Sequence, residues 1–336
     1  MFNGVEAAVE WQRAEGKEAK QSAVLEATLD AVGGNVILQA TEDINFAPGA
    51  GILNAGSSYR IEITSGDRNG HRFEIGSAVN ETLTIEVDSN VCAGAPYSSF
   101  NTTNGLPADL TGASFVIVRD QTLNEMAPIS LFHGTNSSSS ADRVLYPNGT
   151  GGWIQFWAYQ PSTGAARWVR SGSGLTSQNN VTFAANQAVF VHPRQAGKSL
   201  VSYGMVRSSA FASPLCTGTA MIGAGYPVDM SPAQFHYTPA QFLGTRSSHS
   251  AEQMLLWTRD GFSLSDQDGY TGYWLFETAT QGKWLKVGET NLTGYDNTKL
   301  VRSGRGHFFR ALEDHREHVY PRPWTPAIRS TNGVTP

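Results

Sequence analysis

The sequence is poor in charge. Of its 336 residues 16% are Asp, Glu, Lys or Arg, and the formal net charge at pH 7 is -5. Lysine is confined to positions 17, 20, 198, 283, 286 and 299, and no Lys or Arg cluster could neutralise a run of phosphates. We therefore expect no nucleic-acid partner. The scarcity of lysine also leaves exposed sheet edges with few of the charges that normally protect them.

Long hydrophobic runs are missing too. No stretch approaches the roughly 18 to 20 apolar residues of a transmembrane helix. The N-terminus lacks the basic, apolar and small-residue order of a secretory signal. We expect no membrane span, and no signal peptide in the chain as given.

Cysteine occurs twice, at Cys92 and Cys216. Their spacing does not distinguish a long-range disulfide from two buried thiols, and zinc needs more ligands than two. We treat Cys92 and Cys216 as a structural pair, bonded or not.

Hydrophobic residues make up 40% of the chain, and the 35 glycines accompany abundant Ser, Thr and Asn. This composition is typical of a β-rich, turn-rich globular protein, long enough for two or three domains.

The first thirty residues differ from the rest. Asn3 and Glu6 resemble a helix N-cap with its capping-box acid, and Leu25, Leu29 and Val32 recur at helical spacing before Gly33-Gly34. We predict a helix over residues 5–31. It either packs on its own domain or serves as an arm that docks on a neighbouring subunit.

From Val36 the hydrophobic period becomes two. The stretches "YRIEIT", "HRFEI" and "TLTIEV" alternate apolar and polar residues, and the turn "SGDRNG" separates the first two. With "NVILQA" before them and "SFVIVRD" after them, residues 35–120 are predicted to form about five strands. We expect an antiparallel meander closed into a small barrel or a sandwich.

The rest of the chain repeats itself. "SLFHGTNSSSSADRVLY" (130–146) matches "AQFLGTRSSHSAEQMLL" (240–256) at an offset of 110, which places Phe132 on Phe242. The match resumes at 116, where Trp157 to Gly172 face Tyr273 to Gly288 and Trp168 falls on Trp284. A further slip of two matches "AVFVHP" with "GHFFRA". We predict two antiparallel β-domains with one fold, whose cores contain Phe132, Trp168, Phe242 and Trp284.

The predicted layout of this all-β protein has six parts. They are an N-terminal helical arm (1–34), the meander domain (35–125), repeat 1 (126–215), a linker (216–235), repeat 2 (236–325) and a C-terminal tail (326–336).

Several stretches carry a resemblance to a known family. "YRIEITSGDRNGHRFEIGSAVNETLTIEV", "SADRVLYP", "ARWVRSG", "YWLFETATQGKWLKVG" and "LVRSGRGHFFRA" resemble an uncharacterised family of secreted β-rich proteins from Verrucomicrobia-type bacteria. The resemblance covers residues 55–325 and implies export or surface display. The family has no established activity, so no residue role follows from it. The charged segment after Met1, where a signal peptide would stand, departs from the family and admits a virion-borne relative.

The run "WIQFWAY" is the strongest chemical feature. Alternation sends Trp153, Trp157 and Tyr159 to one face of a strand and Phe156 to the other, so both faces are apolar. The same holds for Tyr273, Trp274 and Phe276. We expect one face to be covered by the sister domain, by another subunit, or by a sugar ring stacked on indole.

We find no pattern that calls for a cofactor or a resident metal. His315 and His318, among acidic neighbours, read as a solvated polar face and not as a metal site. Asp266, Asp268 and Glu277 fail the calcium-loop pattern because Thr271 stands where glycine is required, which leaves only a looser calcium site as an alternative. No nucleophile elbow or phosphate-binding loop is present.

The sequence favours a non-enzymatic structural or assembly subunit of a cell-surface layer, a filament or a virus particle. It would be extracellular or part of a virion, and would bind copies of itself or other structural subunits through its aromatic β-surfaces. The alternative is a module that binds surface glycans on Trp and Tyr. The third hypothesis is a polysaccharide-directed enzyme.

Overall fold

The computed structural model describes thirteen stretches of the chain, which form nineteen strands and three short helical segments. The protein is therefore mostly β, and its sheets are antiparallel. Among these residues no helix has the length and apolar character needed to cross a membrane. The described stretches are 25–29, 36–40, 45–50, 53–80, 82–86, 110–148, 152–183, 188–194, 210–213, 215–223, 225–257, 269–315 and 318–323.

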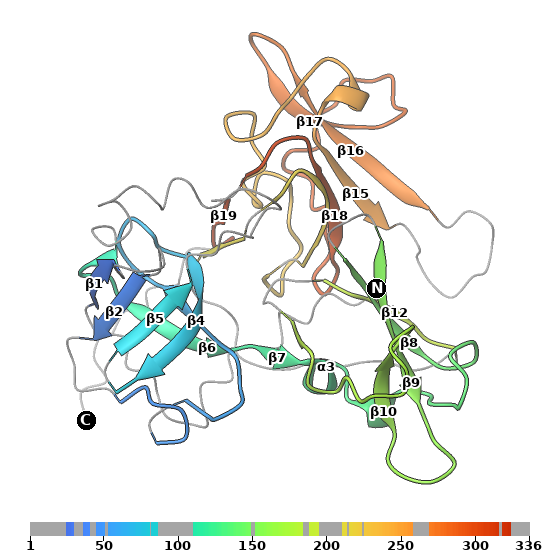
Figure 1. Ribbon diagram of the computed structural model, residues 1–336. Helices are drawn as coiled ribbons and strands as arrows, with labels where there is room; N and C mark the ends of the chain where they lie inside the picture. The colour runs from blue at the N-terminus through green and yellow to red at the C-terminus, as the bar shows by residue number, and fades with distance from the viewer. Residues whose placement is uncertain are drawn as a thin grey trace, which may run out of the picture.

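The first lobe is a six-stranded sheet, blue and cyan in Figure 1. Its strand order is β1-β2-β5-β4-β3-β6. Strands β2 to β6 lie at the five alternating stretches of residues 35–120. The bounds are Leu25–Leu29 (β1), Val36–Ala40 (β2), Tyr59–Ile63 (β3), Arg72–Val79 (β4), Thr82–Glu86 (β5) and Phe115–Arg119 (β6).

The predicted helix over residues 5–31 is wrong for Leu25–Leu29, which form β1 and pair with β2 from Leu29↔Val36 to Leu25↔Ala40. Leucines four residues apart fit one face of a helix, but they fit one face of a strand equally well because four is also an even number. In the sequence the Gly33-Gly34 pair falls between these two paired strands. Residues 1–24 lie outside the described part of the chain.

The barrel alternative for the first lobe is also wrong. In the described residues the sheet begins at β1 and ends at β6, and these two strands do not pair with each other. After Asp120, β6 continues into β7 (Gln121–Thr122), which pairs with β11 (Thr182–Phe183) of the next lobe. The chain that follows β6 thus pairs with the neighbouring lobe and not with β1.

Gly70 holds the first lobe against a distant segment. It ends the turn between β3 and β4 at φ 91°, a conformation that glycine adopts without strain. Its carbonyl accepts a 2.6 Å hydrogen bond from the Ala212 backbone N–H. A Cβ added at Gly70 would lie 3.1 Å from Phe211 Cα, so a side chain would push the two segments apart.

The second lobe, which we call the first unit, comprises residues 122–194. Its four-stranded sheet has the order β10-β9-β8-β12. A short helix, α3 (Leu123–Met126), and the 3-10 turn η2 (Ile129–Leu131) precede the sheet. The strands are Arg143–Pro147 (β8), Trp153–Tyr159 (β9), Arg167–Arg170 (β10) and Phe190–His192 (β12).

The third lobe, which we call the second unit, comprises residues 231–315 and the added strand β14. Its sheet has the order β14-β18-β15-β16-β17. Strand β14 lies in the segment predicted as a linker. The bounds are Gly218–Ile222 (β14), Gln253–Trp257 (β15), Tyr270–Glu277 (β16), Gly282–Lys286 (β17) and His307–Ala311 (β18), with a 3-10 turn η3 at Ser248–Ser250.

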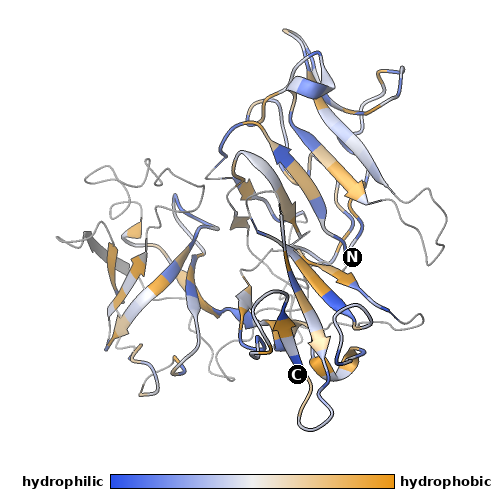
Figure 2. Cartoon of the chain, turned by 45° about the vertical axis from the view of Figure 1, so that its right-hand side comes forward, coloured by the Kyte–Doolittle hydropathy of each residue, from blue (hydrophilic) through white to orange (hydrophobic). Residues whose placement is uncertain are grey.

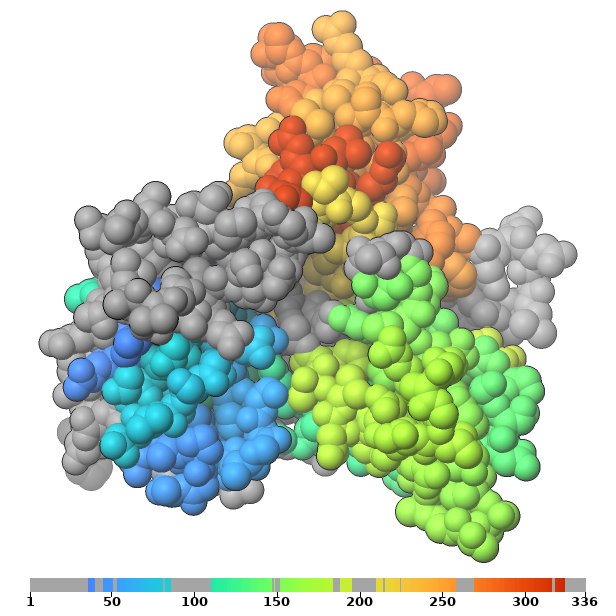
Figure 3. All heavy atoms as spheres, viewed as in Figure 1, coloured from blue at the N-terminus to red at the C-terminus, as the bar shows by residue number. Residues whose placement is uncertain are grey.

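Two short strands complete the description, β13 (Phe211–Ala212) and β19 (Val319–Tyr320), which pair with each other. Figure 2 shows the hydrophobic residues mainly on the strands of each lobe. In Figure 3 the three lobes are distinct, with the first unit in green and the second in orange and red. The units meet where β8 and β12 approach β15 and β18 (Figure 1).

Candidate functional site

Both units begin with the same local structure. Thr122 Oγ1 accepts from the Glu125 N–H while the Glu125 carboxylate accepts from the Thr122 N–H, which is a capping box. Ser231 and Gln234 exchange the same two bonds. The recurring contacts therefore start earlier than residues 126 and 236, the predicted starts of the repeats.

A buried tryptophan closes each core. Trp168 and Trp284 are both fully buried. The indole Nε1–H of Trp168 donates to the Ala127 carbonyl at 2.8 Å, and that of Trp284 donates to the Tyr237 carbonyl at 2.8 Å. Phe132 packs on Trp168 with ring centroids 4.9 Å apart, and Phe242 is buried in the core that contains Trp284.

A buried carboxylate ties the two ends of each unit together. Asp142 accepts from the backbone N–H groups of His133 and Arg194 at 2.7 and 2.6 Å. Glu252, at the matching position, accepts from those of Leu243 and Leu312 at 3.0 and 2.9 Å.

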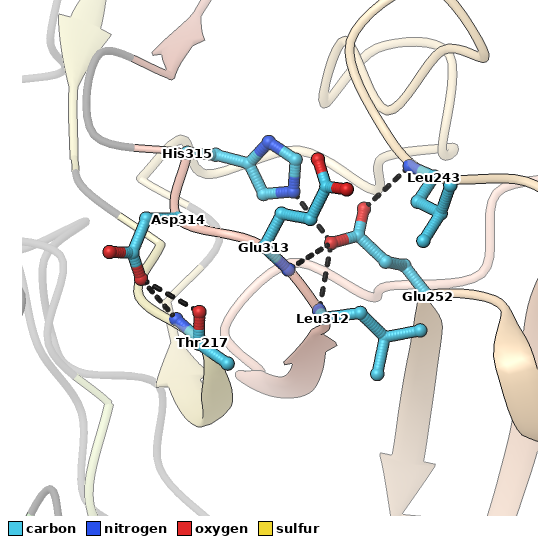
Figure 4. A network of polar contacts seen from close by, with 7 residues as sticks. All are labelled: Thr217, Leu243, Glu252, Leu312, Glu313, Asp314 and His315. Carbon is cyan, nitrogen blue, oxygen red and sulfur yellow. Dashed lines mark hydrogen bonds and ion pairs between the residues drawn. The ribbon is translucent and has the colours of Figure 1, made fainter.

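Glu252 has two further partners among the described residues. His315 Nε2 lies 2.6 Å from its Oε1, and the Glu313 N–H lies 3.4 Å away (Figure 4). In the same network Asp314 accepts from the backbone N–H and hydroxyl of Thr217.

The pairing of strands corrects the predicted alignment of β9 with β16 by one residue. Arg143 lies opposite Trp157, and its counterpart Gln253 lies opposite Trp274, so Trp157 corresponds to Trp274 and not to Tyr273. At Trp168 and Trp284 the offset is 116 again, because the turn after β16 is one residue shorter. In a strand a slip of one residue exchanges the two faces. The corrected register places like side chains on like faces.

Each of these sheets has an inner face towards its core and an outer face. On β9 the inner face carries Phe156, which is 3% exposed, and on β16 it carries Tyr273, 7% exposed. The outer face carries Trp153, Trp157 and Tyr159 in the first unit and Trp274 and Phe276 in the second. Phe156 and Tyr273 thus belong to the cores of their units.

An aromatic pair stands at the same place on each outer face. Trp157 and Tyr159 meet edge to face with centroids 5.3 Å apart, and Trp274 and Phe276 do so at 5.6 Å. A cation stands opposite each pair in the register, Arg167 and Lys283 respectively. Both cations donate to the carbonyl of a matching leucine, Arg167 to Leu175 at 3.1 Å and Lys283 to Leu292 at 2.6 Å, and Arg167 also lies over the Tyr159 ring at 4.8 Å.

The two outer faces meet through five rings, which we call the joint cluster: Trp153, Phe190, Trp257, Tyr270 and Phe308. Phe190 and Phe308 occupy matching positions on β12 and β18, and their centroids are 5.6 Å apart. A contact between a residue and its own counterpart is the mark of an isologous, two-fold arrangement.

The joint cluster is not fully enclosed. Trp153 contacts Phe190 at 5.2 Å and Tyr270 contacts Phe308 at 5.5 Å, yet the two side chains remain 44% and 47% exposed. Trp153 and Tyr270 are themselves counterparts in the corrected register. Of these rings only Trp153 was singled out in the sequence. The match of "AVFVHP" with "GHFFRA" already paired Phe190 with Phe308 and was the available signal.

The solvated polar face predicted for His315 and His318 is wrong. His318 is 5% exposed and its Nε2 lies 2.9 Å from the Phe235 carbonyl, because β19 carries it into the core of the second unit. His307 is fully buried against the Tyr237 hydroxyl at 3.0 Å. Burial lowers the pKa of His307 to about 3 and that of His318 to about 3.

Cys216 takes part in a disulfide. Cys92, its only candidate partner in the sequence, lies outside the described residues, so their pairing stays a prediction. Within the described part of the chain no three His, Cys, Asp or Glu side chains gather as metal ligands. Asp266 and Asp268 of the alternative calcium site lie outside that part.

The comparisons with known proteins give no family and no function. No protein-family model matches the chain, no curated protein matches it, and no solved structure matches it.

Proposed function

We propose that the protein is a non-enzymatic structural or assembly subunit that associates with copies of itself through the joint cluster. We further infer that its two units derive from one duplicated segment. The matched capping boxes, buried tryptophans and buried carboxylates support the duplication, since each recurs with the same partner positions.

The observation that carries the proposal is the exposure of Trp153 and Tyr270 at matching positions of the joint cluster. Aromatic side chains bury 150 to 250 Å² each when fully covered, so roughly half of that area remains available on each ring. A surface with an exposed aromatic ring at matching positions on both sides suits a second copy, because a similar contact is then made twice.

The setting of the protein belongs to the same proposal. A surface layer, a filament or a virus particle would each use a chain that joins its copies side by side. The N-terminal arm, residues 1–34, stays a prediction and could add a contact to a neighbouring subunit.

Analytical ultracentrifugation over a range of protein concentrations tests the proposal. The unaltered chain should sediment as a concentration-dependent oligomer, and Trp153→Ser with Tyr270→Ser should shift it to monomer. Val79→Ser is the matched control, since Val79 is an exposed apolar residue of the first lobe, far from the joint cluster in sequence. A chain that stays monomeric throughout, or a double variant that associates as before, would contradict the proposal.

A further inference from the structure

The outer face of the second unit carries a row of three polar and aromatic side chains that the joint cluster does not use. Arg310 on β18 lies directly opposite Gln253 on β15, and Gln253 lies directly opposite Trp274 on β16. All three are partly exposed. Neighbouring strands are about 4.8 Å apart, so the row spans roughly 10 Å.

The side chain of Arg310 makes no hydrogen bond or ion pair with the described residues, although it is only partly exposed. A guanidinium offers five donors in a planar fork that matches a carboxylate, and withdrawing it from water without a partner costs free energy. The row therefore presents a cation in need of an anionic partner.

The matching row of the first unit is His192, Arg143 and Trp157. There His192 takes the place of Arg310, and Arg143, at the place of Gln253, donates from its Nε and its Nη2 to the Ser138 carbonyl at 2.9 and 2.6 Å. Trp157 is 7% exposed, and Trp274 is the more exposed indole. The second unit therefore differs by combining an arginine at this end of the row with the more exposed indole.

Gln253 supplies the middle of the row. Its amide nitrogen donates to the Ser248 carbonyl, which orients the amide oxygen as a remaining acceptor. The three groups are thus a fork for a carboxylate, an acceptor for a hydroxyl, and an indole face for a flat ring.

We propose that Arg310, Gln253 and Trp274 bind an oligosaccharide of uronic acids. A uronate carries the carboxylate, the hydroxyl donors and the pyranose ring on one scaffold, and an oligomer supplies a second ring next to the first. The guanidinium of Arg310 receives the carboxylate in a bidentate pair, and a second sugar ring stacks on Trp274. This site is independent of self-association, because it lies outside the joint cluster.

Isothermal titration calorimetry of the full chain with oligogalacturonate tests the site. We expect saturable binding that weakens as salt is raised, and a loss of about tenfold to a hundredfold in affinity for Arg310→Gln, the effect of removing a charge-assisted hydrogen-bonded pair. Trp274→Phe should weaken binding by a smaller factor, since the ring is kept but its area is reduced. Arg167→Gln is the control in the first unit and should bind as the unaltered chain does.

Two competing ligands sharpen the result. A neutral galactan oligosaccharide and a glutamate oligopeptide should both bind far more weakly than the uronate. Equal binding of the neutral sugar, equal binding of the acidic peptide, no measurable binding of oligogalacturonate, or unchanged affinity in Arg310→Gln would each overturn the proposal. Near-ultraviolet circular dichroism checks that the variants keep their aromatic packing.

Discussion

The two units fill matching core positions with different kinds of side chain, apolar in the first unit and polar in the second. In the first unit Ala127 and Val189 are buried apolar residues, and at the matching places the second unit has Tyr237 and His307. The Tyr237 hydroxyl and His307 Nε2 are 3.0 Å apart, so an apolar pair in one core is replaced by a hydrogen-bonded pair in the other. This hydrogen bond offsets part of the cost of burying the two polar groups.

Three contacts are the same in both units, and we call them the frame. They are the capping box, the tryptophan that donates to a backbone carbonyl, and the carboxylate that joins two loop ends. Other core residues differ, and the core of the second unit contains the buried histidines His307 and His318. The following predictions test this contrast from the largest expected effect to the smallest.

Loss of the frame tryptophan should cost the same in both units. Trp168→Ala and Trp284→Ala each leave a cavity in a fully buried site and orphan a carbonyl, so each should lower the free energy of unfolding by about 3 to 5 kcal/mol. Urea denaturation followed by circular dichroism measures this. A loss below about 1 kcal/mol for either variant would show that its tryptophan is not part of a shared frame.

Acid should destabilise the second unit first. In the folded chain His307 and His318 stay neutral down to about pH 3, whereas in the unfolded chain they bind protons below their ordinary pKa of about 6.5. Their contribution to stability is therefore complete above about pH 6.5 and is lost as the pH falls towards 3. The loss is about 1.4 kcal/mol for each histidine and each pH unit in that window.

His318→Gln checks the acid effect, because its amide can still donate to the Phe235 carbonyl. Denaturation midpoints between pH 6 and pH 4 should give a slope lower by about 1.4 kcal/mol per pH unit for the variant. An unchanged slope would mean that His318 titrates alike in both states.

Both buried carboxylates should contribute to stability. Asp142→Asn weakens the hydrogen bonds from the His133 and Arg194 N–H groups, with an expected cost of about 1 to 2 kcal/mol. Glu252→Gln weakens contacts with four residues, His315 included, and should cost about 2 to 3 kcal/mol. Thermal unfolding measures the two losses, and a loss below about 0.5 kcal/mol for either variant would contradict the structural role of its carboxylate.

The smallest effect is expected at the capping boxes. Thr122→Ala and Ser231→Ala each remove one side-chain acceptor from a backbone N–H and should cost about 1 kcal/mol. The two losses, measured by urea denaturation, should agree within about 0.5 kcal/mol. A clear difference would show that one box is incidental.

Much of this arrangement could be predicted from the sequence. Period-two alternation locates β2 to β6, because the apolar residues of these strands gather on one buried face of the sheet. The repeated "GT-x-S-S" stretch and the paired tryptophans locate the matching parts of the two units.

The strand at residues 25–29, the register of β9 with β16 and the joint cluster depend on contacts between residues that are far apart in the sequence. Leu25 and Leu29 fit a helix or a strand, and only the partner strand decides between them. An alignment gap placed one residue away from its true position matches Trp157 with Tyr273 instead of Trp274. The sequence does not reveal the error, since aromatic residues occupy both faces of β9 and β16. The joint cluster needed the spatial position of Phe190 against Phe308, which no periodicity reports.

The contact of Phe190 with Phe308 is the centre of the account, and a double-mutant cycle of unfolding free energies tests it most directly. With Phe190→Ala, Phe308→Ala and the double variant, we predict a coupling of about 0.5 to 1.5 kcal/mol, the range for a pair of touching rings. The same cycle with Phe190 and Phe73, which belongs to the core of the first lobe, should give none. Additive losses for Phe190 and Phe308, within about 0.3 kcal/mol, would contradict the two-fold joint and the self-association built on it.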